Sequence, residues 1–229
     1  MQRVAGSPAT PSSHSSRSSV PPSSDSARET AVAADPAALA RRARAALAVF
    51  GSTSRQEPIE WAAEDPLDPQ LAEYYRTVGP EWVEIDTIGL PFLFFPLERL
   101  WDEQADYRWS RRTGARLVDW NEDWTVVAKQ GADPFIFEAS TGAVLTAPGE
   151  DGWEDRLDEP EPTFTSLPEL TLALCSIGAA WARFDDPFTA DFSIRPEVTA
   201  AVVSELEAVL GDHARAVTVA RKVGYFQAV

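Results

Sequence analysis

The chain has 229 residues, of which 44% are hydrophobic and 10% aromatic, enough for one domain with a sizeable buried core. Lys and Arg total 20 while Asp and Glu total 36, which gives a formal net charge of −16 at pH 7. Such a chain repels nucleic acids and anionic membranes and attracts basic partners, although the same acidity can serve solubility alone. We therefore expect neither a nucleic acid nor a membrane among its partners.

The charge is unevenly distributed along the chain. Residues 1–55 contain seven Arg and three acids, a net of +4, so residues 56–229 contain 13 basic and 33 acidic side chains, a net of −20. The few basic residues are not grouped into the patch with aromatics that nucleic-acid readers use. The part expected to attract a basic partner is therefore the acidic segment 56–229.

The N-terminal residues 1–34 are dominated by Ser, Pro, Ala and Thr. Such a composition buries too little apolar surface to offset the entropy of ordering, so we predict a disordered tail. The tail is either a flexible tether or an over-extended gene start. A helical segment at 35–55 and an α+β domain at 56–229 are predicted to follow it.

Two helices are predicted after the tail from the same signals: a capping Asp, a Pro in the first turn, an apolar stripe and a Gly at the end. In chain order these residues are Asp35, Pro36 and Gly51, then Asp68, Pro69 and Gly79. Short apolar runs bounded by Gly and Pro then predict strands, with a short helix at 96–101. The predicted strands are 82–85, 90–95, 124–128, 135–138 and 143–146. The short Gly-containing links between the last three predict an antiparallel meander.

The C-terminal third is predicted to be mainly helical. A capping box at Ser166 and Glu169 opens one helix, and Pro196 opens a final helix that ends before Gly211. The last segment, 216–229, is predicted to be either one more strand or a short packed tail. Together these elements predict an α+β fold with a central antiparallel sheet flanked by helices.

The densest run of acids lies at 149–162, where seven acids accompany one Arg. Trp153 lies inside this run, so we interpret it as an exposed aromatic that anchors a partner while the acids steer the encounter. The predicted partner-binding residues are Glu150, Asp151, Trp153, Glu154, Asp155, Asp158 and Glu159.

No pattern in the chain predicts catalysis, a cofactor or a metal. The two His, His14 and His213, have no nucleophile near them in sequence, and structural zinc needs four His or Cys ligands. The acidic run does not have the EF-hand spacing, and no phosphate-binding Gly motif is present. Adjacent acid pairs such as Asp185 and Asp186 leave a carboxylate hydrolase as a remote alternative.

The only cysteine, Cys175, lies in the apolar run LTLALCSIGAAW, which favours a buried structural thiol over a nucleophile. No stretch reaches the ~18 apolar residues of a membrane span, and residues 1–30 lack the apolar core of a secretory signal. These features predict a cytoplasmic protein.

The stretch from about residue 67 to 182 resembles the SUKH superfamily, which includes bacterial immunity proteins and the yeast cell-wall synthesis regulator. The resemblance lies in a strand, an Asp-Pro turn, an aromatic strand, a hairpin and a helix. The residues that carry it are Trp124, Gly131, Asp133, Pro134, Phe135 and Gly142.

The resemblance implies a non-enzymatic role in which the protein binds and neutralises a cognate bacterial toxin. Such a toxin is expected to have a basic surface, which the acidic segment 56–229 would complement. The alternative is a regulatory or scaffold protein without a toxin partner, for which residues 1–55 would tether the binding partner.

Overall fold

The two N-terminal helices begin where Asp side chains cap them. In the computed structural model, α1 (Pro36–Leu47) starts where the Asp35 carboxylate accepts a hydrogen bond from the Ala37 amide. The Asp68 carboxylate does the same for the amides at the start of α2 (Pro69–Thr77). Both predicted helices are thus confirmed. The structure describes residues 35–61, 66–118, 120–146 and 162–225, and the predicted disorder of residues 1–34 lies outside these ranges.

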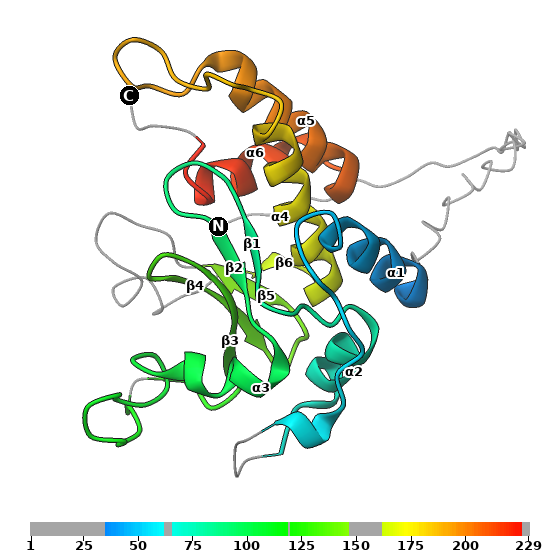
Figure 1. Ribbon diagram of the computed structural model, residues 1–229, viewed down its shortest axis with the longest axis vertical. Helices are drawn as coiled ribbons and strands as arrows, with labels where there is room; N and C mark the ends of the chain where they lie inside the picture. The colour runs from blue at the N-terminus through cyan, green and yellow to red at the C-terminus, as the bar shows by residue number, and fades with distance from the viewer. Residues whose placement is uncertain (1–34, 62–65, 119, 147–161, 226–229) are drawn as a thin grey trace, which may run out of the picture. The chain divides into compact units, whose positions relative to one another are not determined.

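Within the described residues, six short strands form one antiparallel sheet in which each strand pairs with its neighbour in the chain (Figure 1). In order they are β1 (Val83–Ile85), β2 (Phe92–Phe94), β3 (Trp124–Gln130), β4 (Asp133–Glu138), β5 (Val144–Thr146) and β6 (Pro162–Phe164). The predicted meander and the α+β fold with a central antiparallel sheet are confirmed. β6 was not predicted, because it has only three residues and starts with Pro162, the last residue of the acidic run.

Glycines occupy the tight turns of the meander. Gly131, between β3 and β4, has φ +62°, and Gly142, between β4 and β5, has φ +75°. L-residues adopt this left-handed region only at a cost, so Gly is the residue of choice at both turns. A Cβ on Gly142 would also collide with the Gln70 side chain, so the second turn packs closely against α2.

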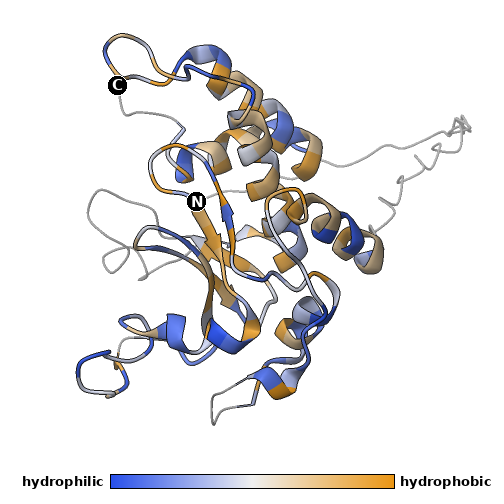
Figure 2. Cartoon of the chain, viewed as in Figure 1, coloured by the Kyte–Doolittle hydropathy of each residue, from blue (hydrophilic) through white to orange (hydrophobic). Residues whose placement is uncertain are grey.

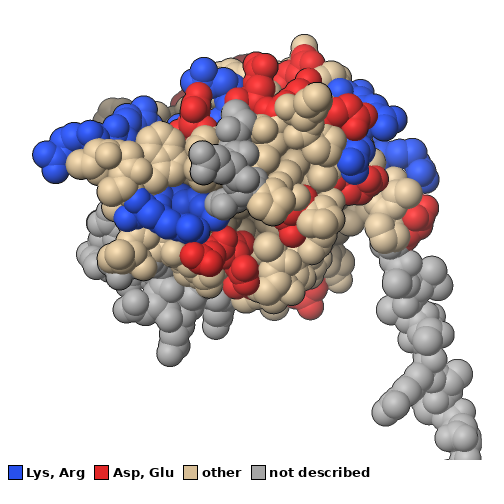
Figure 3. Space-filling view, turned by 90° about the horizontal axis from the view of Figure 1, so that it is seen from below, with Lys and Arg blue, Asp and Glu red and all other residues tan. Residues whose placement is uncertain are grey.

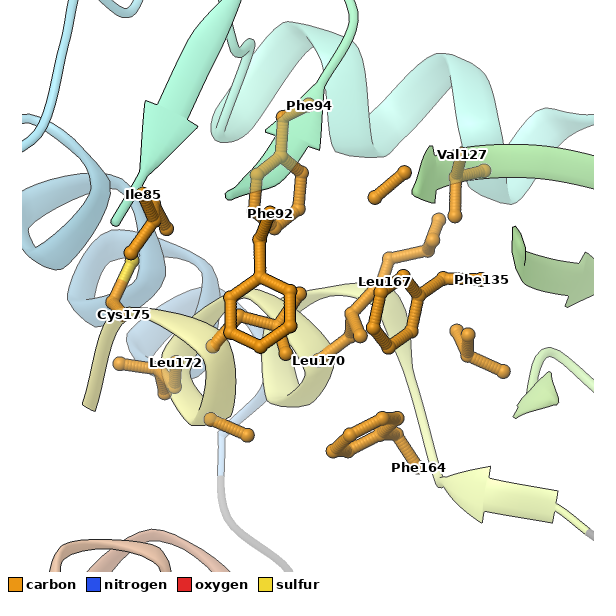
Figure 4. Close-up of a cluster of buried hydrophobic side chains, with 14 of the residues drawn as sticks. Ile85, Phe92, Phe94, Val127, Phe135, Phe164, Leu167, Leu170, Leu172 and Cys175 are labelled. Atoms are coloured by element: carbon orange, nitrogen blue, oxygen red, sulfur yellow. The ribbon is translucent and has the colours of Figure 1, made fainter. Parts of the chain in front are cut away.

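The core lies between the sheet and α4 (Leu167–Trp181). Figure 4 shows Phe92, Phe94, Phe135 and Phe164 of the strands gathered around Leu170 and its neighbours on α4. Four buried Phe rings bring a large apolar area into one contact layer, which contributes strongly to stability. Figure 2 shows the same distribution, with hydrophobic residues concentrated on the strands and on α4.

Other helices pack on α4 or on a helix that contacts it. α1 and α5 (Pro196–Leu210) both contact α4, and α6 (His213–Lys222) packs against α5. Of the two alternatives predicted for 216–229, the further strand is wrong, because the described residues up to Lys222 belong to α6. The packed alternative agrees with the structure, since α6 packs against α5. The apolar positions of this segment, Ala216, Val219, Ala220 and Val223, recur at helical spacing and are all buried.

A segment rich in aromatic residues connects β2 to β3. It contains α3 (Leu97–Leu100), the short 3₁₀ helix η2 (Asp102–Gln104), and a loop at 105–123. Trp120 packs edge-on against Trp124, with ring centroids 5.6 Å apart, and the Tyr107 hydroxyl donates to the Ala132 carbonyl at 2.6 Å. These contacts fasten the segment to both ends of β3. Another short 3₁₀ helix, η1 (Pro58–Glu60), precedes α2.

Candidate protein-binding surface

Residues 184–195, here named the Phe192 loop, join α4 to α5 as a compact hairpin. The Thr189 amide donates to the Ser193 carbonyl at 2.8 Å, and the Phe192 amide donates to the Thr189 carbonyl at 3.0 Å. Phe188 and Ile194 form a β-bridge below this turn. The backbone of the loop tip is therefore held in one conformation by its own hydrogen bonds.

Phe192 is presented to solvent at the tip of this loop in an unfavourable conformation. Its side chain is 82% exposed and its backbone has φ +63°. Three-residue hairpin loops usually have Gly at such a left-handed position. An L-residue there lowers the stability of the fold by roughly 1–2 kcal/mol. An exposed aromatic residue at a strained position is unfavourable for solubility and for folding, and such positions cluster at functional sites.

The Phe192 loop carries three carboxylates, of which Asp191 is the direct neighbour of Phe192 in the chain. Asp185, Asp186 and Asp191 are exposed, and the single basic residue of the loop, Arg195, pairs with Asp186 at 2.6 Å. The hydrogen bond that Asp191 accepts from the Thr189 hydroxyl lowers the pKa of its carboxyl group. Asp191 is therefore charged at neutral pH, and the loop has three acids against one base.

The base of the Phe192 loop rests on aromatic residues that are partly or fully buried. Phe188 packs edge-on against Trp181 of α4, with centroids 5.8 Å apart, and Trp181 packs against Tyr225 at 6.0 Å. The Tyr225 hydroxyl is hydrogen-bonded to Thr87, between β1 and β2. A rigid base lowers the entropy that the loop would lose when a partner binds Phe192.

Phe192→Gly is expected to stabilise the fold by roughly 1 kcal/mol, because Gly adopts the left-handed conformation without the Cβ clash. Urea denaturation of the variant and the unchanged protein measures the difference. Phe192→Ala keeps the Cβ and is the control, with little expected change. Equal stability of the Gly and Ala variants would show that the loop stores no strain.

The predicted partner-binding residues lie outside the described residues, in the segment between β5 and β6. They are Glu150, Asp151, Trp153, Glu154, Asp155, Asp158 and Glu159. The Phe192 loop has the same chemistry, an aromatic side chain among carboxylates, and the sequence reasoning did not identify it. Its signal was the motif ADFS in a turn, where a bulky residue stands in place of the usual Gly.

The other residues considered for chemistry have structural positions. Cys175 is buried, which raises the pKa of its thiol to about 12 and keeps it protonated. His213 is exposed at the start of α6, with Nδ1 2.7 Å from Glu207. Burial raises the pKa of Asp133. The prediction that Asp133 and Pro134 belong to the turn is wrong, because both are the first residues of β4 and the turn consists of residues 131 and 132. Among the described residues no group of three His, Cys, Asp or Glu is placed to hold a metal ion.

Basic residues are more grouped than the sequence reasoning expected. Figure 3 shows Lys and Arg side chains in separate groups on one face of the molecule, with acidic side chains between them. One such group lies in the loop between η2 and β3, where Arg108 stacks over Trp101 at 5.7 Å. Arg111 and Arg116 of this loop are paired with acids, and the four Arg of residues 105–123 are matched by four acids, so the loop has no net charge.

No family model, curated protein or solved structure matches this chain. The resemblance to the SUKH superfamily therefore stays a prediction that rests on the residues named for it. Within the described part of the chain, no helix is both long and apolar enough to cross a bilayer.

Proposed function

We propose that this chain is a non-catalytic protein-binding module of the cytoplasm that neutralises a cognate toxin with a basic surface by direct binding. The observation that carries the proposal is Phe192, an exposed and strained aromatic residue on a hydrogen-bonded loop with three carboxylates. Aromatic residues with few rotatable bonds are typical binding hot spots. The net charge of −16 and the resemblance to immunity proteins support the same role.

The charge should accelerate association with a basic partner. Electrostatic steering raises association rates by roughly 10- to 1000-fold at low salt, and the gain falls as salt is added. The Phe192 loop and the acidic residues 150–159 are the two proposed contributors, one inside and one outside the described residues. Neutralising each set of acids separately, and measuring association rates at low and high salt, separates their contributions.

Phe192→Ala should weaken binding by about 2 kcal/mol, roughly 30-fold in Kd, because a buried aromatic anchor is lost. The partner to use is the product of the adjacent gene, and binding is measured by calorimetry and by rescue of growth in co-expression. Ile59→Ala is the matched control, since Ile59 is 91% exposed on η1. An adjacent product that is harmless and does not bind would overturn the toxin proposal.

Deleting the N-terminal tail distinguishes this role from a tethered scaffold. The deletion should end at residue 33, because α1 is part of the compact unit Ala34–Val229. Toxin neutralisation through the Phe192 loop predicts that binding survives the deletion. A scaffold that holds its partner through the tail predicts that binding is lost while Phe192→Ala has no effect.

A further inference from the structure

A groove opens between α1 and α2, far in sequence from the Phe192 loop. It encloses about 750 Å³ and is lined by both helices, the turn between β4 and β5, and the first residues of α4. We name it the α1–α2 groove. Its volume lies within the range of pockets that hold small molecules.

The groove has a short lining along α1. It runs from Pro36 to Arg44, nine residues that span about 12 Å of helix. Gly142 and the start of α4 also line it. Near the C-terminal end of this stretch, Arg44 donates to the Thr53 carbonyl at 3.4 Å. A lining of this length suits a compact ligand.

The floor of the groove is part of the protein core. Ala40, Tyr74, Phe137 and Leu167 line it and are all buried. The Tyr74 hydroxyl is hydrogen-bonded to Thr171 at 2.9 Å, so its polar atom is already satisfied. The floor therefore offers packing to an apolar group.

The rim of the groove is basic, although the chain as a whole has a net negative charge. Its lining contains Arg41, Arg44 and Arg76 but only one acid, Glu73. Arg41 pairs with Asp35 at 3.7 Å, between exposed side chains, and such a pair contributes little. Arg76 pairs with Glu73 at 3.6 Å and also with the glutamate before η1.

Arg44 differs from its neighbours on the rim. It is half-buried, and no described carboxylate lies within ion-pair distance of its guanidinium group. The carbonyl of Thr53, at 3.4 Å, occupies one donor and leaves the others for a ligand. A half-buried guanidinium group beside an apolar floor favours an anion with an apolar body.

We propose that the α1–α2 groove binds a small amphiphilic carboxylate, with the alkyl chain on the floor and the carboxylate at Arg44. The site is independent of the Phe192 loop, so it holds or fails separately from the proposed toxin binding. The ligand class follows from the short lining along α1, the apolar floor and the charge of Arg44, which no described carboxylate pairs.

Calorimetric titration of the full chain with saturated monocarboxylates of six to twelve carbons tests the proposal. Each added methylene should tighten binding about three- to fourfold until the groove is full, as expected for burial of apolar area. Decanol and decyltrimethylammonium have an alkyl chain one carbon longer than that of decanoate and no negative charge. They should nevertheless bind at least roughly tenfold more weakly than decanoate.

Matched variants locate the ligand. Arg44→Gln should weaken decanoate binding roughly tenfold or more, while Arg42→Gln, an exposed neighbour outside the groove lining, should leave it unchanged. Ala37→Leu fills part of the groove and should also weaken binding, whereas Ala45→Leu on the same helix should not. Circular dichroism establishes that each variant is folded.

Three results would overturn the proposal. If decanol bound as tightly as decanoate, the negative charge of the ligand would not contribute to binding. If the Arg44 and Arg42 variants had equal effects on decanoate binding, the ligand would not bind in the groove. Binding of a synthetic Glu- and Leu-containing peptide that Arg44→Gln weakens, while decanoate does not bind at all, would replace the small ligand by a peptide.

Discussion

Replacing Arg215 with Ala is expected to lower the free energy of unfolding by about 3 kcal/mol. The Arg215 guanidinium group on α6 donates to both carboxylate oxygens of Glu169 on α4, at 2.9 and 2.7 Å. Glu169 is only 9% exposed and also accepts the Thr165 amide at 2.6 Å. The variant would leave a buried carboxylate without its counter-charge, which costs far more than the loss of an exposed ion pair.

An exposed ion pair of the same residue types is the control. Arg183 and Glu205 join the end of α4 to α5, and the Arg183 side chain is 53% exposed. Arg183→Ala should cost less than about 1 kcal/mol. Urea denaturation of both variants measures the contrast, and equal losses would mean that burial of Glu169 does not determine the strength of its ion pair.

The stabilising effect of Arg215 should depend on pH. Burial by itself raises the pKa of Glu169, but the hydrogen bonds from Arg215 and Thr165 outweigh it and hold the pKa below its ordinary value of 4.5. A carboxyl group with a lowered folded-state pKa contributes stability above its unfolded pKa, and that contribution is lost as the pH falls through the folded value. The difference between Arg215→Ala and the unchanged protein should therefore shrink below about pH 4.5.

Much of the fold could be predicted because its signals are local. A capping Asp followed by Pro defines the start of α1 and of α2 within a few residues, and no distant contact is needed to read it. The strands of the meander were equally clear, since Gly131 and Gly142 mark turns that only a left-handed residue completes.

The elements that were missed depend on distant contacts. In α6 the run VTVA has strand propensity, but the apolar face from Ala216 to Val223 packs against α5 and favours the helix. The ion pair between Glu169 and Arg215 joins residues 46 positions apart, so no spacing rule indicates it. Tertiary packing decides both cases.

The candidate site shows the same division. The sequence shows where acids and aromatic residues lie close together along the chain, and this predicts a binding site around Trp153. It does not show which aromatic side chains are exposed in the folded protein. Phe192 is exposed because the hairpin hydrogen bonds of Thr189 turn it away from the core. Exposure and backbone strain arise only when the chain has folded, so the Phe192 loop became visible only in the structure.

The second large loss of stability is expected on substitution of Gln104. Its side chain makes the hydrogen bonds that a neighbouring strand would make if β2 continued beyond its end. Its side-chain amide donates to the carbonyls of Leu100 and Val126, at 2.8 and 2.9 Å, and its oxygen accepts the Val126 amide at 2.8 Å. β2 pairs only with Ala128, Lys129 and Gln130 of β3, so the Gln104 side chain replaces the missing strand beside Val126. Gln104 itself is fully buried.

Gln104→Leu should therefore cost about 3 kcal/mol, because it leaves buried backbone groups of Val126 and Leu100 without partners, at roughly 1–3 kcal/mol for each unsatisfied group. Gln130→Leu is the matched control: its amide also donates to two carbonyls, those of Ile88 and Leu90, but at a site that water can reach. Water then replaces the lost partner, so this variant should cost less than about 1 kcal/mol. Urea denaturation separates the two, and similar losses would mean that Gln104 acts through packing of its side chain and not by completing the sheet.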